Sequence, residues 1–201
     1  MDADQAAAPD WLRHWIDHVP RGNALDLGAG SGELSVWLSQ RGFQVTAVER
    51  DPEALTALRH RAENFRFQVV EADLASFQPK PQSQSLILAA AVLHFLMPGR
   101  LKKVAERMEH ALIPGGFLMA EVLTIDDPSF RERVEKQEPI EPNTYPIEGG
   151  EGFIHYFEKG ELKRVFPELQ ILRYEEDRRA APAAIGGYRA GATLVARRPH
   201  P

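Results

Sequence analysis

Short apolar runs alternate along the chain with longer stretches in which apolar residues recur every three or four positions. The short runs predict buried strands at 23–27, 44–48, 67–71, 84–89 and 116–122. The helical spacing predicts helices from Pro9-Asp10 and at 32–41, 52–64 and 100–110. Strands that alternate with helices indicate a parallel sheet with helices on both faces.

The pattern changes in the C-terminal third. Residues 158–166 predict a helix, and residues 169–176 and 192–197 predict two strands. The segment 180–187 between these strands is rich in Ala, Pro and Gly and contains no helix, so the strands are expected to pair antiparallel. The chain therefore predicts one α/β domain over residues 1–201, with a doubly wound seven-stranded sheet that is mostly parallel and has an antiparallel C-terminal strand.

Residues 124–155 form the least regular stretch, with four prolines and a glycine-rich turn at 149–152. A loop of this length in a compact domain is usually a functional cover or disordered. It follows the fifth strand, and Phe153, Tyr156 and Phe157 supply apolar surface for packing. We expect a substrate lid, with a plain surface loop as the alternative.

Composition limits the functions that remain open. The 201 residues are 43% hydrophobic and 26% charged, as in ordinary globular proteins, and the absence of cysteine excludes disulfides and thiolate nucleophiles. The net charge of −5 and the lack of a basic stripe argue against nucleic acid as a partner. No metal site is expected, since His14 and His18 have no third ligand nearby. Without a signal peptide or a membrane-spanning apolar run, a cytoplasmic protein with no membrane partner is expected.

The most informative run is Ala-Leu-Asp-Leu-Gly-Ala-Gly-Ser-Gly at 24–32, which places Asp26 before Gly28, Gly30 and Gly32. It predicts a buried strand, a glycine turn and a helix start, where a nucleotide-like ligand can lie against bare backbone. Glu49 comes at the end of the second strand, where an acid can accept two hydrogen bonds from a ribose diol.

The spacing of the glycines separates two ligand classes. A dinucleotide fingerprint needs a third glycine at the position that Glu33 occupies here. A carboxylate there would repel a pyrophosphate, whereas it tolerates the cationic sulfonium of S-adenosylmethionine (SAM). Asp26 also suits a ligand with a cationic amino-acid end.

These residues resemble the first motif of the class I SAM-dependent methyltransferases, and later blocks continue the resemblance. Residues 69–74 resemble the end of the family's third strand, 85–96 the fourth strand and its following segment, and 112–119 the fifth strand. The resemblance implies a Rossmann-like fold with SAM as cofactor, in which Glu49 holds the ribose and Asp73 meets the adenine. The expected cofactor-binding residues are Asp26, Gly28, Ala29, Gly30, Gly32, Glu49, Arg50, Asp73, Leu74 and Ala90.

A narrower resemblance lies near the end of the chain. Phe157-Glu-Lys-Gly-Glu-Leu162 and Tyr174-Glu-Glu-Asp177 resemble the helix and strand motifs of the tellurite-resistance methyltransferases, and Val92-Leu-His-Phe-Leu96 resembles another of their motifs. The chain departs from that group in its longer segment after strand five and in lacking a clear His-Arg pair after Tyr-x-Glu-Asp. These departures bear on the metalloid substrate and not on the fold.

Four residues are candidates for contacts with the methyl acceptor. His94 follows strand four, His155 and Tyr156 are expected to open the last helix at the end of the lid, and Arg178 could bind an anion. The alternatives are a packed histidine at 94 and a solvated arginine pair at 178–179.

The sequence thus predicts methyl transfer from SAM to a small-molecule acceptor by in-line displacement. The acceptor could be a metalloid oxyanion or a thiol-type nucleophile, and neither an oxyanion nor a thiolate needs a general base; it could also be a hydroxyl in a small-molecule O-methyltransferase, and a phenol would need one. Two other classes stay open: a SAM-binding protein without turnover, and a nucleotide-dependent oxidoreductase, which the misplaced glycine disfavours.

Overall fold

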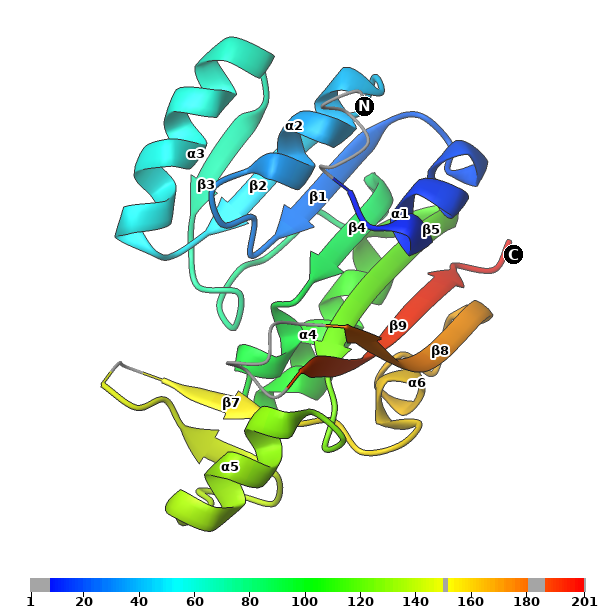
Figure 1. Cartoon of the computed structure of the whole chain (residues 1–201). Helices are drawn as coiled ribbons and strands as arrows, with labels where there is room; N and C mark the ends of the chain where they lie inside the picture. Colours follow the sequence, from blue (N-terminus) through cyan, green and yellow to red (C-terminus); the bar gives the residue numbers. More distant parts are fainter. Residues whose placement is uncertain (1–7, 150–151, 181–186, 201) are drawn as a thin grey trace.

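A seven-stranded sheet forms the centre of the molecule (Figure 1). The computed structural model describes residues 8–149, 152–180 and 187–200. The strands lie in the order β3-β2-β1-β4-β5-β9-β8. Their bounds are Asn23–Leu27 for β1, Gln44–Glu49 for β2, Gln68–Glu71 for β3, Gln84–Ala90 for β4, Leu112–Leu123 for β5, Gln170–Ala180 for β8 and Tyr188–Arg197 for β9.

Strands β1 to β5 pair in parallel, and β9 runs antiparallel to both of its neighbours. The prediction of a mostly parallel sheet with an antiparallel C-terminal strand is therefore confirmed. The last two strands are longer than the sequence indicated, because polar residues such as Asp177 and Arg179 continue the pairing beyond the predicted ends. Residues 181–186 of the Ala-Pro-Gly segment lie outside the described residues.

Helices cover both faces of the sheet. Residues of α1 (Asp10–Trp15), α2 (Glu33–Gln40) and α3 (Pro52–Phe65) pack in one hydrophobic cluster with alternate side chains of the strands. Residues of α4 (Pro98–Ala111) and α6 (Glu161–Val165) pack in a second cluster, with the side chains that point to the other face. This two-sided burial explains why the central strands are nearly continuous apolar runs. In the described residues, no helix is long and apolar enough to cross a membrane.

The stretch 124–155, called the lid segment below, is more regular than the sequence predicted. It contains α5 (Pro128–Lys136) and a small antiparallel sheet of β6 (Thr144–Pro146) and β7 (Phe153–His155). The prediction of an irregular stretch was wrong because a helix start went unrecognised: the Asp127 side chain accepts from the Ser129 N–H, and Pro128 stands at the first helical position. Residues 150 and 151 of the predicted glycine turn lie outside the described residues.

The lid segment lies beyond the ends of the central strands, where α5 and β7 project from the body of the molecule (Figure 1). The Asp127 side chain is fully buried, and its Oδ2 accepts from the Ala190 N–H of β9 at 2.9 Å. Backbone pairing of Thr124 with Phe157 closes the segment at its base. The segment is therefore tied to the sheet at its base and lies beside the strand ends.

Candidate functional site

A cavity of about 350 Å³ lies at the carboxyl ends of the parallel strands, next to the lid segment. Ligands of open α/β sheets bind in this crevice, where neighbouring connections turn to opposite faces. Its lining comes from the ends of β1, β2, β3 and β4, from the short 3₁₀ helix η3 (Leu93–Phe95) and from the lid segment. The lining residues are Gly28, Gly30, Val48, Glu49, Arg50, Asp51, Ala72, Asp73, Leu74, Ala91, Val92, Phe95, Leu96 and Ile147.

The glycine turn forms one edge of the cavity, and its three glycines have different structural roles. All three have positive φ, at 67°, 56° and 93° for Gly28, Gly30 and Gly32. A Cβ on Gly28 would lie 2.3 Å from a methyl of Val92, whereas a Cβ on Gly30 would meet nothing within 4 Å. A Cβ on Gly32 would lie 2.5 Å from a methyl of Leu58 on α3. Gly28 and Gly30 thus line the cavity, while Gly32 permits close packing of α3, which corrects its predicted contact with the ligand.

Glu49 lies at the end of β2, with its carboxylate held by backbone N–H groups. Its Oε2 accepts from Gly30 N at 2.8 Å, and its Oε1 accepts from Arg50 N and Asp51 N at 2.7 and 2.9 Å. A carboxylate has about four lone-pair positions, so three are already used. One position remains on Oε2 for a ribose hydroxyl. The expected second ribose bond would have to replace the Gly30 contact.

Asp73 and Leu74 line the cavity on the β3 side, as predicted. One oxygen of Asp73 accepts from the Ala75 N–H at 2.7 Å, which fixes the carboxylate. The other lies 2.9 Å from the Arg50 guanidinium, and both side chains of this ion pair are about half exposed. An exposed pair of this kind contributes little stability, so Arg50 can move away when Asp73 accepts from a ligand.

Asp26, Ala29 and Ala90 do not line the cavity, in contrast to the prediction. The Asp26 side chain points into the protein, where its carboxylate accepts from the Ser35 hydroxyl at 2.6 Å. Burial raises the pKa of Asp26 to about 6, and the nearby carboxylates of Glu49 and Glu33 act in the same direction. Asp26 therefore joins β1 to α2 beneath the glycine turn.

The far wall of the cavity is apolar and was missed by the sequence analysis. Val92, Phe95 and Leu96 come from the segment after β4, and Ile147 comes from the lid segment just after β6. Ala91, the residue that turns the chain out of β4, adopts a left-handed conformation with φ of 56°. Val92, Phe95 and Leu96 belong to the 92–96 motif, which the sequence analysis noted without assigning it to the cavity, and their place after the fourth strand was a signal that could have found all three.

Comparisons with known proteins agree with this architecture. A family model described as a methyltransferase domain matches residues 24–116, which hold the glycine turn, Glu49 and Asp73. The trans-aconitate 2-methyltransferase of Delftia acidovorans is 29% identical over 177 residues, covering 86% of this chain and 60% of the relative. The probable SAM-dependent methyltransferase TehB of Haemophilus influenzae is 25% identical over 158 residues, covering 76% of this chain and 48% of the relative.

A solved structure of a SAM-dependent methyltransferase from Methanosarcina mazei superposes with a TM-score of 0.79 at 18% identity, covering 92% of this chain and 97% of that one. The chain resembles the class I SAM-dependent methyltransferases in its motifs and in its fold. It resembles TehB within them, and it spans about half the length of the curated relatives that it matches.

The cavity fits the cofactor of this family. It presents three carboxylates, from Glu49, Asp51 and Asp73, against the single guanidinium of Arg50. That balance suits the cationic sulfonium and amino group of SAM and disfavours a pyrophosphate. Bare backbone at Gly30, where a Cβ would meet nothing within 4 Å, gives the ligand room to approach the turn.

His94 is buried directly behind the cavity wall and does not line it. Burial lowers its pKa to about 4, assisted by the positive charge of Arg189 and by His155, while Asp127 opposes the shift. Its Nδ1 has no hydrogen-bond partner among the described residues. The imidazole is therefore neutral at pH 7, and its predicted contact with the acceptor stays a prediction.

His155 and Tyr156 do not open the last helix, which begins at Glu161. Both side chains are buried, in β7 and just after it. The Tyr156 hydroxyl lies 2.9 Å from the Ser129 hydroxyl and accepts from Arg133 Nε at 3.0 Å, so it organises the interior of the lid segment. The sequence misplaced both residues because the polar run Glu158–Gly160 was included in the helix.

Arg178 is paired with Asp126 at 3.6 Å and lies over the ring of Tyr188, with 61% of its side chain exposed. Its neighbour Arg179 contacts Glu121 at 2.6 Å. Neither arginine lines the cavity. The structure thus places Arg178 in a surface ion pair, and its role toward an anionic acceptor stays a prediction.

Proposed function

We propose that this chain transfers a methyl group from SAM to a small-molecule acceptor that is already deprotonated, such as a metalloid oxyanion or a thiolate. When bound, SAM supplies a methyl group that its sulfonium already activates. The chain's own residues bind SAM, orient the acceptor and exclude water. These effects supply most of the acceleration that such a transfer needs.

The observation that carries the proposal is the charge and shape of the cavity. Gly28 and Gly30 line one edge of the cavity, and Glu49 and Asp73 present carboxylates at another. In the described lining, the carboxylates outnumber the guanidinium of Arg50, so the net charge is negative. Glu49 can hold a ribose hydroxyl through Oε2, and Asp73 can accept from an exocyclic amine once Arg50 moves aside. These contacts suit an adenine nucleoside, and the excess of carboxylates in the described lining favours one that carries a sulfonium over one that carries a pyrophosphate.

The acceptor class follows from what the cavity lacks. Among the described residues, no histidine, lysine or tyrosine lines it, and the nearest imidazole, His94, is buried behind the wall. A general base is needed only when the acceptor loses a proton during transfer. The apolar wall of Val92, Phe95, Leu96 and Ile147 instead excludes water from the reacting atoms.

The relatives favour the same class of small acceptor. One of them is a trans-aconitate 2-methyltransferase, named for a carboxylate, and another is the probable SAM-dependent methyltransferase TehB. Carboxylates, metalloid oxyanions and thiolates share a nucleophilic atom that is anionic near neutral pH. A small-molecule O-methyltransferase acting on a phenol would need a base, and the bases in the described lining are the carboxylates of Glu49, Asp51 and Asp73, of which we assign Glu49 and Asp73 to the cofactor.

The test is the release of S-adenosylhomocysteine by the purified protein in parallel reactions with SAM. The acceptors are tellurite, selenite, a small thiol, trans-aconitate and a catechol, with one reaction lacking any acceptor. The proposal expects release above the blank with at least one of the first four. Release with catechol alone would contradict the acceptor class, and SAM binding with no release in any reaction would favour a SAM-binding protein without turnover.

A further inference from the structure

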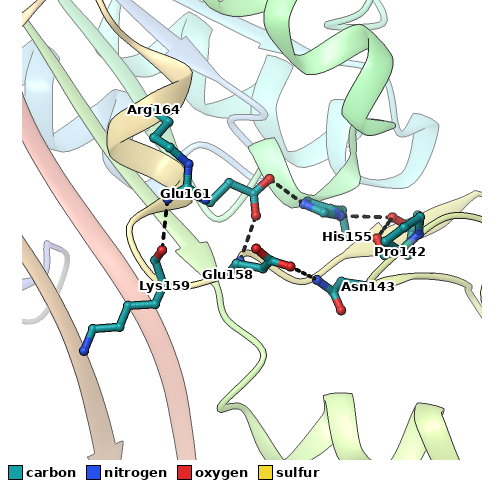
Figure 2. Close-up of polar contacts among 8 residues, drawn as sticks. Pro142, Asn143, His155, Glu158, Lys159, Glu161 and Arg164 are labelled. Atoms are coloured by element: carbon teal, nitrogen blue, oxygen red, sulfur yellow. Dashed lines mark hydrogen bonds and ion pairs between the residues drawn. The ribbon is translucent and has the colours of Figure 1, made fainter.

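A chain of three polar side chains, two buried and one partly buried, lies at the base of the β6–β7 hairpin, where the hairpin meets α6 (Figure 2). His155 of β7 lies with Nδ1 3.0 Å from the Thr144 hydroxyl of β6 and with Nε2 3.0 Å from the Glu161 carboxylate of α6. The side chain of His155 is 4% exposed. We call Thr144, His155 and Glu161 the hairpin latch.

Counting protons shows that the latch is fully bonded when His155 is charged. The Thr144 hydroxyl has one hydrogen and lies 3.1 Å from the Pro142 carbonyl, which can only accept. If Thr144 donates there, the imidazole Nδ1 must donate to Thr144. The Glu161 carboxylate also only accepts, so Nε2 must donate as well. An imidazolium therefore satisfies every group, whereas a neutral ring leaves one contact without a proton.

Further contacts hold the carboxylate in place. Its second oxygen accepts from the Glu158 N–H at 2.8 Å, and the Glu158 side chain accepts from Asn143 at 3.2 Å (Figure 2). Burial raises the pKa of Glu161, but the hydrogen bonds from His155 and the Glu158 N–H outweigh it and hold the pKa below its ordinary value. Two titratable groups from neighbouring elements face the latch. Arg164 of α6 is charged and lies near Glu161, and His94 of η3 is neutral and lies near His155.

The hairpin connects the latch to the cavity. Ile147 follows β6 directly and lines the cavity, and its N–H donates to the Gly152 carbonyl across the hairpin. Thr144 and His155 are a paired row of the same hairpin. A displacement of this row relative to α6 would therefore move Ile147 relative to the glycine turn.

We propose that the hairpin latch sets the position of Ile147 over the cavity, so that His155 and Glu161 are positioning residues for cofactor binding and for the exclusion of water. The proposal rests on the proposed function, because it concerns the same cavity. It also gives His155, a candidate for acceptor contact in the sequence, a role that acts through the hairpin.

The test measures binding of S-adenosylhomocysteine by calorimetric titration, with thermal unfolding recorded for every variant. Glu161→Ala removes the hydrogen bonds to His155 and Glu158 N, and we expect about tenfold weaker binding. In an Ile147→Ala background, the same change should weaken binding less than about twofold. The side chain through which the latch acts on the cavity is already absent there. The loss of thermal stability caused by Glu161→Ala should be the same in both backgrounds.

Glu132→Ala is the matched control. It removes an acid from the lid segment and breaks a 2.7 Å ion pair with Lys136, but both side chains are exposed on α5. Its binding should equal that of the unaltered protein. Should Glu161→Ala fail to fold, Thr144→Val keeps the shape of a buried side chain and removes only the hydroxyl, with about threefold weaker binding expected.

The outcomes separate the two proposals. If the unaltered protein binds and the latch variants bind equally well, the latch proposal is overturned while the proposed function stands. Equal weakening by Glu161→Ala with and without Ile147 also overturns the latch, since it shows a general loss of structure. If the unaltered protein does not bind S-adenosylhomocysteine, the proposed function fails and the latch proposal fails with it.

Discussion

Two regions enclose the cavity, and they are held in position by different kinds of contact. The glycine edge, residues 26–32 with Glu49, is held by residues close in sequence and by neighbouring strands, as in the 2.8 Å bond from Gly30 N to Glu49. The lid segment is held by contacts between distant residues, such as Asp127 with Ala190 and Ser129 with Tyr156. The glycine edge is formed by the ends of the strands themselves, whereas the lid segment is a separate stretch of chain that packs against them.

This difference indicates where change is tolerated. The glycine edge depends on backbone conformations and close approaches that only glycine allows, so most substitutions there act directly on the ligand. The lid segment depends on a few buried polar anchors, so substitutions at those anchors should cost stability first and binding second. The predictions below separate these two kinds of effect.

The largest effect is expected at Gly28. In Gly28→Ala the new Cβ would overlap Val92 Cγ2, and alanine is also strained at a φ of 67°. We expect a loss of about 2–4 kcal/mol in the free energy of unfolding and at least about 100-fold weaker binding of S-adenosylhomocysteine. Urea unfolding measures the loss of stability, and calorimetric titration measures the loss of affinity.

Gly42→Ala is the control for backbone strain. Gly42 also has positive φ, at 83°, but a Cβ there meets nothing within 4 Å and the residue lies outside the cavity lining. It should lose about 1 kcal/mol of stability and retain normal binding. If both variants bind alike, the glycine edge does not contact the ligand.

The second effect is expected at Asp127. Its carboxylate accepts from Ser129 N, Ala190 N and Arg189 Nε at 3.0, 2.9 and 3.2 Å, and Asp127→Ala leaves the two backbone N–H groups without a partner. We expect a loss of about 2–3 kcal/mol in the free energy of unfolding, measured in urea. Asp126→Ala, which removes an exposed acid next in the chain, should change stability by less than about 0.5 kcal/mol. Equal losses at 126 and 127 would show that Asp127 is not an anchor.

A smaller and pH-dependent effect is expected at Asp26. The folded protein binds a proton on Asp26 more tightly than the unfolded chain does, because its pKa rises from 3.8 to about 6. Stability is therefore lost as pH rises from about 4 to about 6, and the loss remains above pH 6. Asp26→Asn should stabilise the protein by about 1–3 kcal/mol at pH 7 and by almost nothing at pH 3.5.

The same variant tests what Asp26 touches. Its carboxylate accepts from Ser35 and does not line the cavity, so Asp26→Asn should change binding of S-adenosylhomocysteine by less than about twofold. Destabilisation at pH 7 would contradict the burial argument. Binding weakened tenfold or more would restore Asp26 to the ligand contacts that the sequence predicted.

The glycine edge and the sheet could be predicted from the sequence because their signals are local. The alternation of strands and helices, the turn after β1 and the acid after β2 each occupy a few consecutive residues. Gly32 and Asp26 were expected to contact the ligand but lie outside the cavity lining, since spacing alone does not reveal that Gly32 lies against Leu58 and that Asp26 bonds to Ser35. Which face a residue of a turn presents depends on helices that lie far along the chain.

The lid segment was harder to predict because its anchors are separated by long stretches of sequence. Asp127 and Ala190 are 63 residues apart, and Tyr156 and Ser129 are 27 apart. Neither pair forms a motif, and the short strands β6 and β7 are stabilised by each other rather than by strand propensity. The Asp-Pro-Ser start of α5 was the one local signal, and it identifies a helix without showing where that helix packs.

Titration with S-adenosylhomocysteine of the unaltered protein and of Glu49→Ala tests the central claim most directly. Glu71→Ala is the matched control, because Glu71 lies beside Glu49 in the sheet register but is absent from the cavity lining. The account predicts one site per chain, normal binding by Glu71→Ala and at least about tenfold weaker binding by Glu49→Ala, about 1.4 kcal/mol. Equal affinity of Glu49→Ala and the unaltered protein would contradict it.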